Sequence, residues 1–321
     1  MPDFLNTKIL KINPVSPEIN QLEIAADILQ KGGLVAFPTE TVYGLGANAL
    51  NEKAVAQIFL AKGRPQDNPL IVHIADKNDL YQLSSNVSDK ALLLVDKFWP
   101  GPLTLILKKT EIVPDIITAG LDCVAIRMPS HPIALALIKE AKIPLAAPSA
   151  NLSGKPSPTD AQHVIDDLYH KIDLIIDGGE VEIGIESTVL DLTTDIPQIL
   201  RPGKITKQDL EEIIGKVTEN TSSKETRSPG MKYRHYSPQA RVFIVNNEQE
   251  IQAFREKYPQ QKIQILNYPD EIKMARQMFS DFRKSDQAGY DIILVQSIKA
   301  EGLGLAIMNR LKKASLNEKL G

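Results

Sequence analysis

The stretch from Leu34 to Ala49, LVAFPTETVYGLGANA, decides how the rest of the chain is interpreted. Its first four residues are apolar and lie between a glycine pair and a proline, which is typical of a buried strand. Gly44 and Gly46 allow a tight turn or a close approach to a bound molecule. Hydroxyl and carboxyl groups follow the strand, where open α/β sheets place their ligands: Thr39, Glu40, Thr41 and Tyr43. The stretch predicts a strand that ends at a binding site, with an ordinary polar loop as the alternative.

The composition is that of an ordinary globular protein. The chain has 321 residues, 43% of them hydrophobic, and a net charge of -3, so it has room for two domains and no overall basic field for nucleic acid. A single cysteine, Cys123, excludes an internal disulfide and a cysteine-cluster metal site and suits a reducing compartment. No apolar run approaches the roughly 18 residues of a membrane span, and the polar start MPDFLNTK does not resemble a signal peptide. We expect a cytoplasmic protein with no membrane contact.

Strand and helix patterns are mixed along the first 217 residues. Apolar runs such as LIVHIA, LTLILKK, CVAIRMP and DLIIDGG predict strands, and segments such as NEKAVAQIFLAK predict helices. Three helix starts are indicated by their capping residues: Ser16 with Pro17, Thr159 with Gln162, and Thr206 with Asp209. This order favours an α/β fold with a twisted, mixed open sheet over a regular repeat of βαβ units.

The composition changes after residue 217. Residues 218–238 are rich in Thr, Ser, Lys, Asn and Pro, as linkers are, and end in SPGMKYRHYSP. Three apolar strands then alternate with three helices, which predicts a small Rossmann-like, three-layer α/β domain. We therefore expect a larger domain at 1–217, a linker or lid at 218–238 and a C-terminal domain at 239–321.

Two common nucleotide motifs are poorly supported. Gly44, Gly46 and Ala49 match the loose pattern GxGxxA, but TETVY separates the strand from the first glycine. The acid at the expected distance, Asp67, lies among prolines in a loop. No GxxxxGK[ST] segment occurs, so a Walker phosphate loop is absent.

Polar side chains recur where the predicted strands of the larger domain end. They are Thr41, Lys62, Arg64, His73, Arg127, Ser149, Asn151, Ser187 and Arg201. A histidine or arginine in a buried strand needs a partner, and one anionic ligand would serve both His73 and Arg127. Structural interpretations remain open for each type: a satisfied core imidazole, solvated cations at a helix end, and turn-forming serine and asparagine.

Seven ordered motifs resemble those of the YrdC-type threonylcarbamoyl-AMP synthases: PTETVYGLG, KGRPQDNPL, WPGPLT, VAIRMPSHP, APSANLSG, GIESTVLD and ILRPG. The SPGMKYRHYSP linker and the second α/β domain resemble the long, two-domain members. The resemblance covers essentially the whole chain. It implies a nucleotidyltransferase that converts L-threonine, bicarbonate and ATP into L-threonylcarbamoyl-adenylate and pyrophosphate, the first step toward threonylcarbamoyl-adenosine in tRNA.

The resemblance also implies roles for individual residues. Lys62 and Arg64 are the implied catalytic residues. The implied ATP contacts are Lys62, Arg64, Asn68, Ser149, Asn151, Ser157, Arg201, His235 and Tyr236. The implied threonine contacts are Thr41, His73, Arg127, Ser187 and the backbone near Ala147. Cys123 shares the strand face of Arg127 and is either a lining residue or a small buried apolar side chain.

The implied reaction sets what must be bound. Threonine's amine captures carbon dioxide as a carbamate whose oxygen attacks the α-phosphate, so the protein holds two anions together. No carboxylate cluster offers a metal site, and Mg²⁺ is expected to arrive on the ATP phosphates. The product is expected to pass to the downstream tRNA threonylcarbamoyl-transfer machinery, and a weak tRNA contact is left open.

Two other functions on the same fold remain open. An RNA-binding module would show salt-dependent affinity and no ATP turnover. A carbamoyl-transfer enzyme with another acceptor would not need threonine.

The linker carries more side-chain chemistry than a tether needs. Its aromatic and cationic side chains suit an adenylate's base and phosphate: Tyr233, Arg234, His235 and Tyr236. Closing it over the pocket would keep water from a mixed anhydride. A lid predicts that a chain truncated near Val217 stays folded yet loses most synthesis, and a plain tether predicts no loss.

Overall fold

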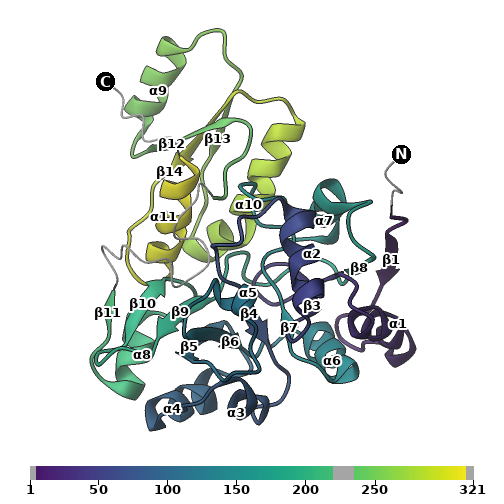
Figure 1. The fold of residues 1–321 in the computed structure, drawn as a ribbon. Helices are drawn as coiled ribbons and strands as arrows, with labels where there is room; N and C mark the ends of the chain where they lie inside the picture. Colours follow the sequence, from purple (N-terminus) through teal and green to yellow (C-terminus); the bar gives the residue numbers. More distant parts are fainter. Residues whose placement is uncertain (1–4, 220–234, 316–321) are drawn as a thin grey trace.

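The computed structural model describes residues 5–219 and 235–315 of the chain. They form a larger α/β unit with a smaller one stacked on it (Figure 1). The predictions for Tyr233, Arg234 and most of the 218–238 segment lie outside the described residues. None of the helices described is long and apolar enough to cross a membrane.

The larger unit contains the first eight helices and eleven strands. Its helices are α1 (Ile19–Gln30), α2 (Glu52–Lys62), α3 (Asp79–Leu83), α4 (Asp89–Phe98), α5 (Asp115–Thr118), α6 (Pro132–Ala141), α7 (Ala161–Leu168) and α8 (Lys207–Ile214). Its strands are β1 (Lys8–Lys11), β2 (Val35–Phe37), β3 (Gly44–Asn48), β4 (Ile71–His73), β5 (Leu103–Lys108), β6 (Cys123–Arg127), β7 (Leu145–Ala146), β8 (Leu174–Asp177), β9 (Thr188–Asp191), β10 (Gln198–Arg201) and β11 (Thr218–Glu219).

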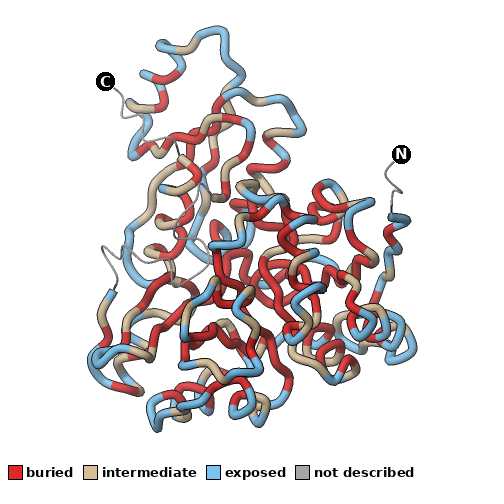
Figure 2. Tube along the Cα trace, viewed as in Figure 1, coloured by how far each residue is buried: buried red, intermediate tan, exposed pale blue. Residues whose placement is uncertain are grey.

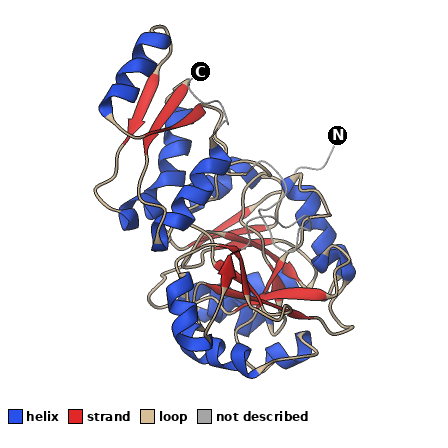
Figure 3. Ribbon diagram, turned by 90° about the vertical axis from the view of Figure 1, so that its left-hand side faces the viewer, coloured by secondary structure: helices blue, strands red, loops and turns tan. Residues whose placement is uncertain are grey.

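These strands form one mixed sheet in the order β1-β8-β2-β3-β7-β4-β6-β5-β9-β10-β11. Parallel pairs such as β4 with β6 and β5 with β9 alternate with antiparallel pairs such as β5 with β6 and β9 with β10. Figure 3 shows the sheet with helices around it. The predicted twisted, mixed open sheet is confirmed.

The opening stretch forms β2 and its hairpin partner β3. All three residues of β2 are fully buried, and Phe37 pairs with Gly44 across the hairpin. Gly46 lies within β3, where an added Cβ would come 2.8 Å from the ring of Phe37. The expectation of a turn at the two glycines was therefore wrong, because the turn is made by the polar residues before them.

Two of the three predicted helix starts were wrong. Helix α1 has Glu18 at its N-cap and no side-chain cap, so Ser16 with Pro17 does not begin it. Helix α7 is capped by Asp160, which accepts a hydrogen bond from the amide of His163 at 3.0 Å. Aspartate caps as well as serine or threonine do, so the adjacent residue can take this place. The capping box of Thr206 with Asp209 is confirmed.

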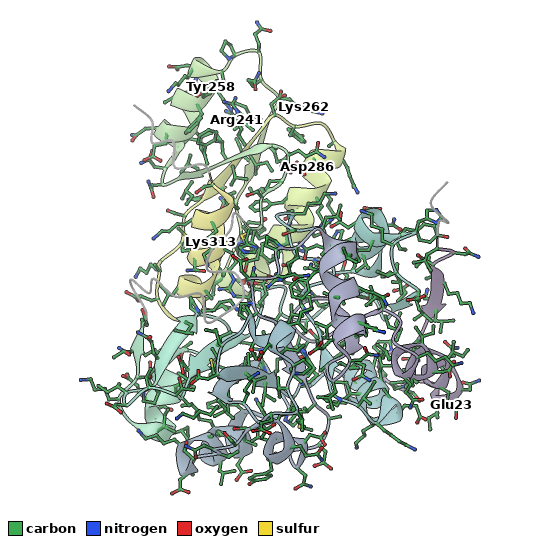
Figure 4. The ribbon with its side chains drawn as sticks, viewed as in Figure 1. Glu23, Arg241, Tyr258, Lys262, Asp286 and Lys313 are labelled. Carbon is green, nitrogen blue, oxygen red and sulfur yellow. The ribbon has the colours of Figure 1, made fainter. Side chains whose placement is uncertain are left out.

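The smaller unit has three layers, as predicted. Its parallel sheet β12-β14-β13 comprises Arg241–Val245, Ile292–Gln296 and Ile263–Leu266. Helix α9 (Glu248–Lys257) packs on one face, whereas α10 (Glu271–Gln287) and α11 (Gly302–Ala314) pack on the other. The Arg241 guanidinium lies 5.0 Å from the ring centroid of Tyr258 (Figure 4). Asp286 accepts hydrogen bonds from the amides of Gln239 and Ala240 and so fixes the chain entering β12.

The two units share part of their cores. Ile183 and Ile185 of the larger unit belong to the apolar cluster formed by α10, α11 and the smaller sheet. Figure 2 shows buried chain continuing from one unit into the other. Gly184, between these isoleucines, has φ +88°, and an added Cβ would lie 2.3 Å from the backbone oxygen of Ala275. The division at residue 217 stays a prediction, and β11 adds Thr218 and Glu219 to the larger sheet.

We predict that Gly184→Ala destabilises the protein more than Gly179→Ala does. Gly179 also has a positive φ, +81°, but open space around its missing Cβ. Both variants incur about 1–2 kcal/mol of left-handed backbone strain, whereas Gly184→Ala adds roughly 1–3 kcal/mol from overpacking against α10. Denaturant unfolding measures the difference, and equal losses would show that α10 does not pack closely on Gly184.

Candidate functional site

A cleft lies at the C-terminal ends of β4, β6 and β10. The chain that precedes β12 also reaches it. Those strands end at His73, Arg127 and Arg201. Twelve of the fifteen predicted site residues line it: Thr41, Arg64, His73, Arg127, Ala147, Ser149, Asn151, Ser157, Ser187, Arg201, His235 and Tyr236. Lys62, Asn68 and Cys123 do not. The sequence pattern therefore brought residues from distant strands to one place, although their roles stay predictions.

Arg127 is held in place by a carboxylate. Its Nη2 lies 2.7 Å from Glu40 Oε1, and both side chains are only 5% exposed. Its Nη1 donates to Thr41 Oγ1 at 2.9 Å. Because Arg127 is the last residue of β6 and Glu40 follows β2, this ion pair joins two strand ends, and the Arg127 side chain lines the cleft.

His73 is a buried imidazole at the end of β4. Burial, and then the charge of the neighbouring Arg127, lower its pKa to about 3. Its Nδ1 has no hydrogen-bond partner among the described residues. The ring is therefore neutral at physiological pH, and an unpaired polar atom at this depth points to a ligand. The unpaired Nδ1 favours a ligand contact over the structural alternative of a fully satisfied core imidazole.

Ser187 and Arg201 form a second fixed pair. Arg201 donates through Nε to the Ser187 carbonyl at 3.0 Å and through Nη2 to Ser187 Oγ at 3.1 Å. The same hydroxyl lies 2.8 Å from Thr104 Oγ1. Burial lowers the pKa of Arg201 to about 10, so its guanidinium remains charged.

The segment 149–157 is held by hydrogen bonds from Lys62, and we call it the nucleotide loop after the ATP contacts that the family resemblance implies for it. The Lys62 ammonium donates to the backbone carbonyls of Ser149 and Asn151, each at 2.5 Å. Ser149 Oγ donates to Asn151 Oδ1 at 2.5 Å. Burial, and then the charge of Arg64, hold the pKa of Lys62 well below its usual value. Lys62 is only 2% exposed, so the alternative of a solvated surface cation is wrong for it.

The Arg64 side chain donates hydrogen bonds to the backbone of the loop that carries Asn68. Arg64 Nη2 donates to the carbonyls of Asn68 and Pro69 at 3.2 and 3.1 Å. Arg64 is 9% exposed and lines the cleft, so it too is not a solvated surface cation. The Asn68 side-chain amide is 1% exposed, and neither of its polar atoms has a partner among the described residues.

The end of the linker enters the cleft. His235 and Tyr236 line it, and the Tyr236 ring stacks on Phe279 of α10 at 5.2 Å. Burial lowers the pKa of His235 to about 4, with Arg64 the next cause, and raises the pKa of Tyr236 to about 12. Both side chains are therefore neutral, and His235 Nε2 has no hydrogen-bond partner among the described residues.

Two charged lining residues were missed from the sequence, Lys155 and Glu186. Glu186 Oε1 accepts a hydrogen bond from Ser157 Oγ at 2.5 Å. The feature of the sequence that could have identified Glu186 is its position next to Ser187 in the motif GIESTVLD. Cys123 does not line the cleft but packs in an apolar cluster behind it with Ile71, which does, and this favours its interpretation as a small buried residue.

The charge of the cleft suits anions. Its lining contains four cationic side chains and one carboxylate: Arg64, Arg127, Lys155, Arg201 and Glu186. Within residues 5–219 and 235–315, no three His, Cys, Asp or Glu side chains are grouped to hold a metal ion. The arrangement can therefore bind two negatively charged groups side by side and stabilise charge that develops between them.

Comparison with known proteins identifies two family regions. Residues 27–203 match the family described as "Telomere recombination". Residues 205–315 match "Threonylcarbamoyl-AMP synthase, C-terminal domain".

Individual relatives match nearly the full length. The chain is 49% identical to the threonylcarbamoyl-AMP synthase of Pyrococcus abyssi, covering 92% of this chain and 94% of the relative. It is 48% identical to the Bacillus subtilis protein of the same name, with 92% and 93% covered. The crystal structure of P. abyssi Sua5 complexed with L-threonine superposes with a TM-score of 0.92 at 47% identity, covering 96% of this chain and 98% of that one.

We predict that His73→Gln makes stability less dependent on pH. Because the pKa of His73 falls from 6.5 to about 3 on folding, the unfolded chain binds a proton between those values that the folded protein does not. Stability is therefore lost as pH falls, by up to ~1.4 kcal/mol per pH unit for one histidine. Denaturant unfolding at pH 4 to 7 should show a shallower loss in His73→Gln, and parallel curves would contradict a buried neutral His73.

Proposed function

Because the chain belongs to the threonylcarbamoyl-AMP synthase family in its long, two-domain form, we propose that it converts L-threonine, bicarbonate and ATP into L-threonylcarbamoyl-adenylate and pyrophosphate. The observation that supports this most is the cleft itself, which is lined by four cationic side chains and by His73, whose Nδ1 has no hydrogen-bond partner among the described residues. Such a site fits one substrate with a carboxylate and another with phosphates.

The proposed reaction joins two anions. A carbamate oxygen of N-carboxy-threonine attacks the α-phosphorus, the new P–O bond forms, and the bond to the β-phosphate oxygen breaks to release pyrophosphate. Little covalent chemistry is required of the protein, so rate comes from positioning and charge stabilisation. Arg64 lines the cleft and is proposed to stabilise charge on the phosphates. Lys62 is proposed to act with it, through the loop carbonyls that it fastens.

Threonine is proposed to bind between β4, β6 and β9. The fixed guanidinium of Arg127 suits its carboxylate, and the Thr41 and Ser187 hydroxyls suit its hydroxyl. His73 and the backbone at Ala147 complete this side. A relative of similar structure has been crystallised with L-threonine, which supports threonine as the substrate.

ATP is proposed to lie against the nucleotide loop. Ser149, Asn151 and Ser157 would contact the phosphates and ribose, with Asn68 and Arg201 as further contacts. Mg²⁺ would arrive bound to the ATP phosphates, since the described residues offer no metal cluster of their own. We further propose that the product passes to the tRNA threonylcarbamoyl-transfer machinery in the cytoplasm, with at most weak contact between this chain and tRNA.

His235 and Tyr236 are proposed to cover the bound adenylate. Their neutral rings in the cleft, half-buried for His235 and buried for Tyr236, favour stacking and hydrogen bonding over charge pairing. Truncation near Val217 does not isolate this effect, because it also removes α10 and α11, which pack on the larger unit. Variants of His235 and Tyr236 in the full chain are the cleaner measure of a lid.

One assay separates the proposal from its rivals. Pyrophosphate release is measured with threonine, bicarbonate and ATP all present, and then with each omitted in turn. A synthase requires all three, a carbamoyl-transfer enzyme on this fold turns over without threonine, and an RNA-binding module releases no pyrophosphate.

We predict that Arg64→Ala lowers the rate of synthesis by on the order of 100-fold or more, the usual cost of one charge-stabilising donor. Arg276→Ala is the control, because that side chain is half exposed and pairs with Glu180 on the surface. Circular dichroism establishes that both variants are folded. Wild-type turnover in folded Arg64→Ala would remove Arg64 from the catalytic residues.

We predict that valine is rejected more strongly than serine. A site that hydrogen-bonds a substrate hydroxyl leaves its own polar groups unpaired when the hydroxyl is missing, whereas a missing methyl leaves only a small gap. Competition assays with each amino acid against threonine measure the ratio. Equal use of valine and threonine would show that Thr41 and Ser187 do not hydrogen-bond the substrate hydroxyl.

A further inference from the structure

Two arginines of the smaller unit are buried inside the larger one. Arg283 lies on α10 and Arg310 on α11, and their side chains are 8% and 0% exposed. Arginine is seldom buried so fully unless it is paired. Each pairs with a carboxylate of the larger unit, and each of these carboxylates accepts a hydrogen bond from the nucleotide loop.

Arg310 reaches the loop through Glu186. Its Nε donates to Glu186 Oε2 at 3.0 Å and its Nη2 to the Glu186 carbonyl at 3.3 Å, while Nη1 donates to the carbonyl of Pro202. The other carboxylate oxygen of Glu186 accepts from Ser157 Oγ at 2.5 Å. Glu186 is therefore a bridge between α11 and Ser157, at the end of the nucleotide loop.

Arg283 reaches the same loop directly. Its Nη2 donates to the carbonyl of Pro156 at 2.5 Å and to Asp167 Oδ2 at 2.8 Å. Asp167 in turn accepts from the Lys155 ammonium at 2.8 Å and from the Leu152 amide at 3.3 Å. The loop is thus fastened at three of its residues by one buried arginine and its carboxylate.

Both carboxylates are ionised in spite of their burial. Burial raises the pKa of Glu186, but Arg310 and Arg201 together bring it below its usual value. Burial likewise raises the pKa of Asp167, and the bond and charge of Arg283 bring it below its usual value. Buried ion pairs often add little net stability, because desolvation offsets their attraction. Two of them converging on one loop are better explained by a need for fixed geometry.

We propose that Arg283 and Arg310 are positioning residues that hold the nucleotide loop in the geometry that binds ATP. The smaller unit thereby completes the ATP side of a site whose other residues belong to the larger unit. This inference rests on the proposed function, since it takes the loop to be where ATP binds. It assigns to α10 and α11 a role that is separate from any covering of the cleft by the linker.

A third arginine provides a matched control. Arg276, also on α10, pairs with Glu180 of the larger unit at 3.5 Å, with side chains 51% and 72% exposed. It joins the same two units, but Glu180 lies outside the nucleotide loop. Removing Arg276 therefore tests loss of an inter-unit ion pair without disturbing the loop.

The experiment uses the full chain with Arg283→Met, Arg310→Met or Arg276→Met, assayed for pyrophosphate release at varied ATP and varied threonine. Misplacement of a binding group by about 1 Å costs on the order of 100-fold in rate. We expect kcat/KM for ATP to fall by about that factor in the Arg283 and Arg310 variants. We expect the binding of threonine alone, measured by calorimetry, and all parameters of Arg276→Met to stay as in the wild type.

Arg283→Lys and Arg310→Lys serve if a methionine variant does not fold. Lysine keeps the charge but cannot make the forked contacts, so each should lose part of kcat/KM for ATP and keep threonine binding. Folded variants that match Arg276→Met, or that lose ATP and threonine in parallel, would overturn the positioning role. Absence of turnover in the wild type would instead refute the synthase assignment itself.

Discussion

The structure depends on how its buried cations are held at the ends of the large sheet's strands. A guanidinium or ammonium taken out of water needs fixed partners. Arg127 has Glu40, Lys62 has two loop carbonyls, and Arg201 has Ser187. Because these partners fix each cation before a substrate arrives, little reorganisation is needed when negative charge develops there. The same contacts join strand ends that are far apart in sequence, so the fold and the site are stabilised by one set of bonds.

The smaller unit is joined to the larger one through its core and through buried side chains. Its core includes isoleucines of the larger unit, its helix α10 packs on Gly184, and its arginines end at the nucleotide loop. The smaller unit is therefore not an independent domain that is merely tethered to the larger one. Since Tyr236 stacks on Phe279, even the position of the linker's last residues depends on α10. The linker and the helices contribute to the site by different contacts, which point substitutions separate and truncation does not.

Much of the site could be predicted because it consists of polar residues where apolar strands end, as at His73 and Arg127. The position of β2 followed from its apolar composition between a glycine pair and a proline, whereas β1 was not predicted. Exact helix starts could not, since Asp160 caps as well as its neighbour Thr159. Glu186 and Arg310 were missed because an ion pair between units depends on how the chain returns in three dimensions. Glu186 stands beside Ser187 in the motif GIESTVLD, but nothing in the sequence shows that Arg310 is its partner.

The central claim is that threonine and ATP meet in the cleft between the strand ends and the nucleotide loop. A crystal structure with L-threonine and a non-hydrolysable ATP analogue bound together tests it most directly. The account predicts the threonine carboxylate on Arg127, the phosphates against Ser149 and Asn151, and the threonine amine facing the α-phosphate. An analogue bound elsewhere, for example in the outer groove lined by Asp166 and Gln287, would contradict it.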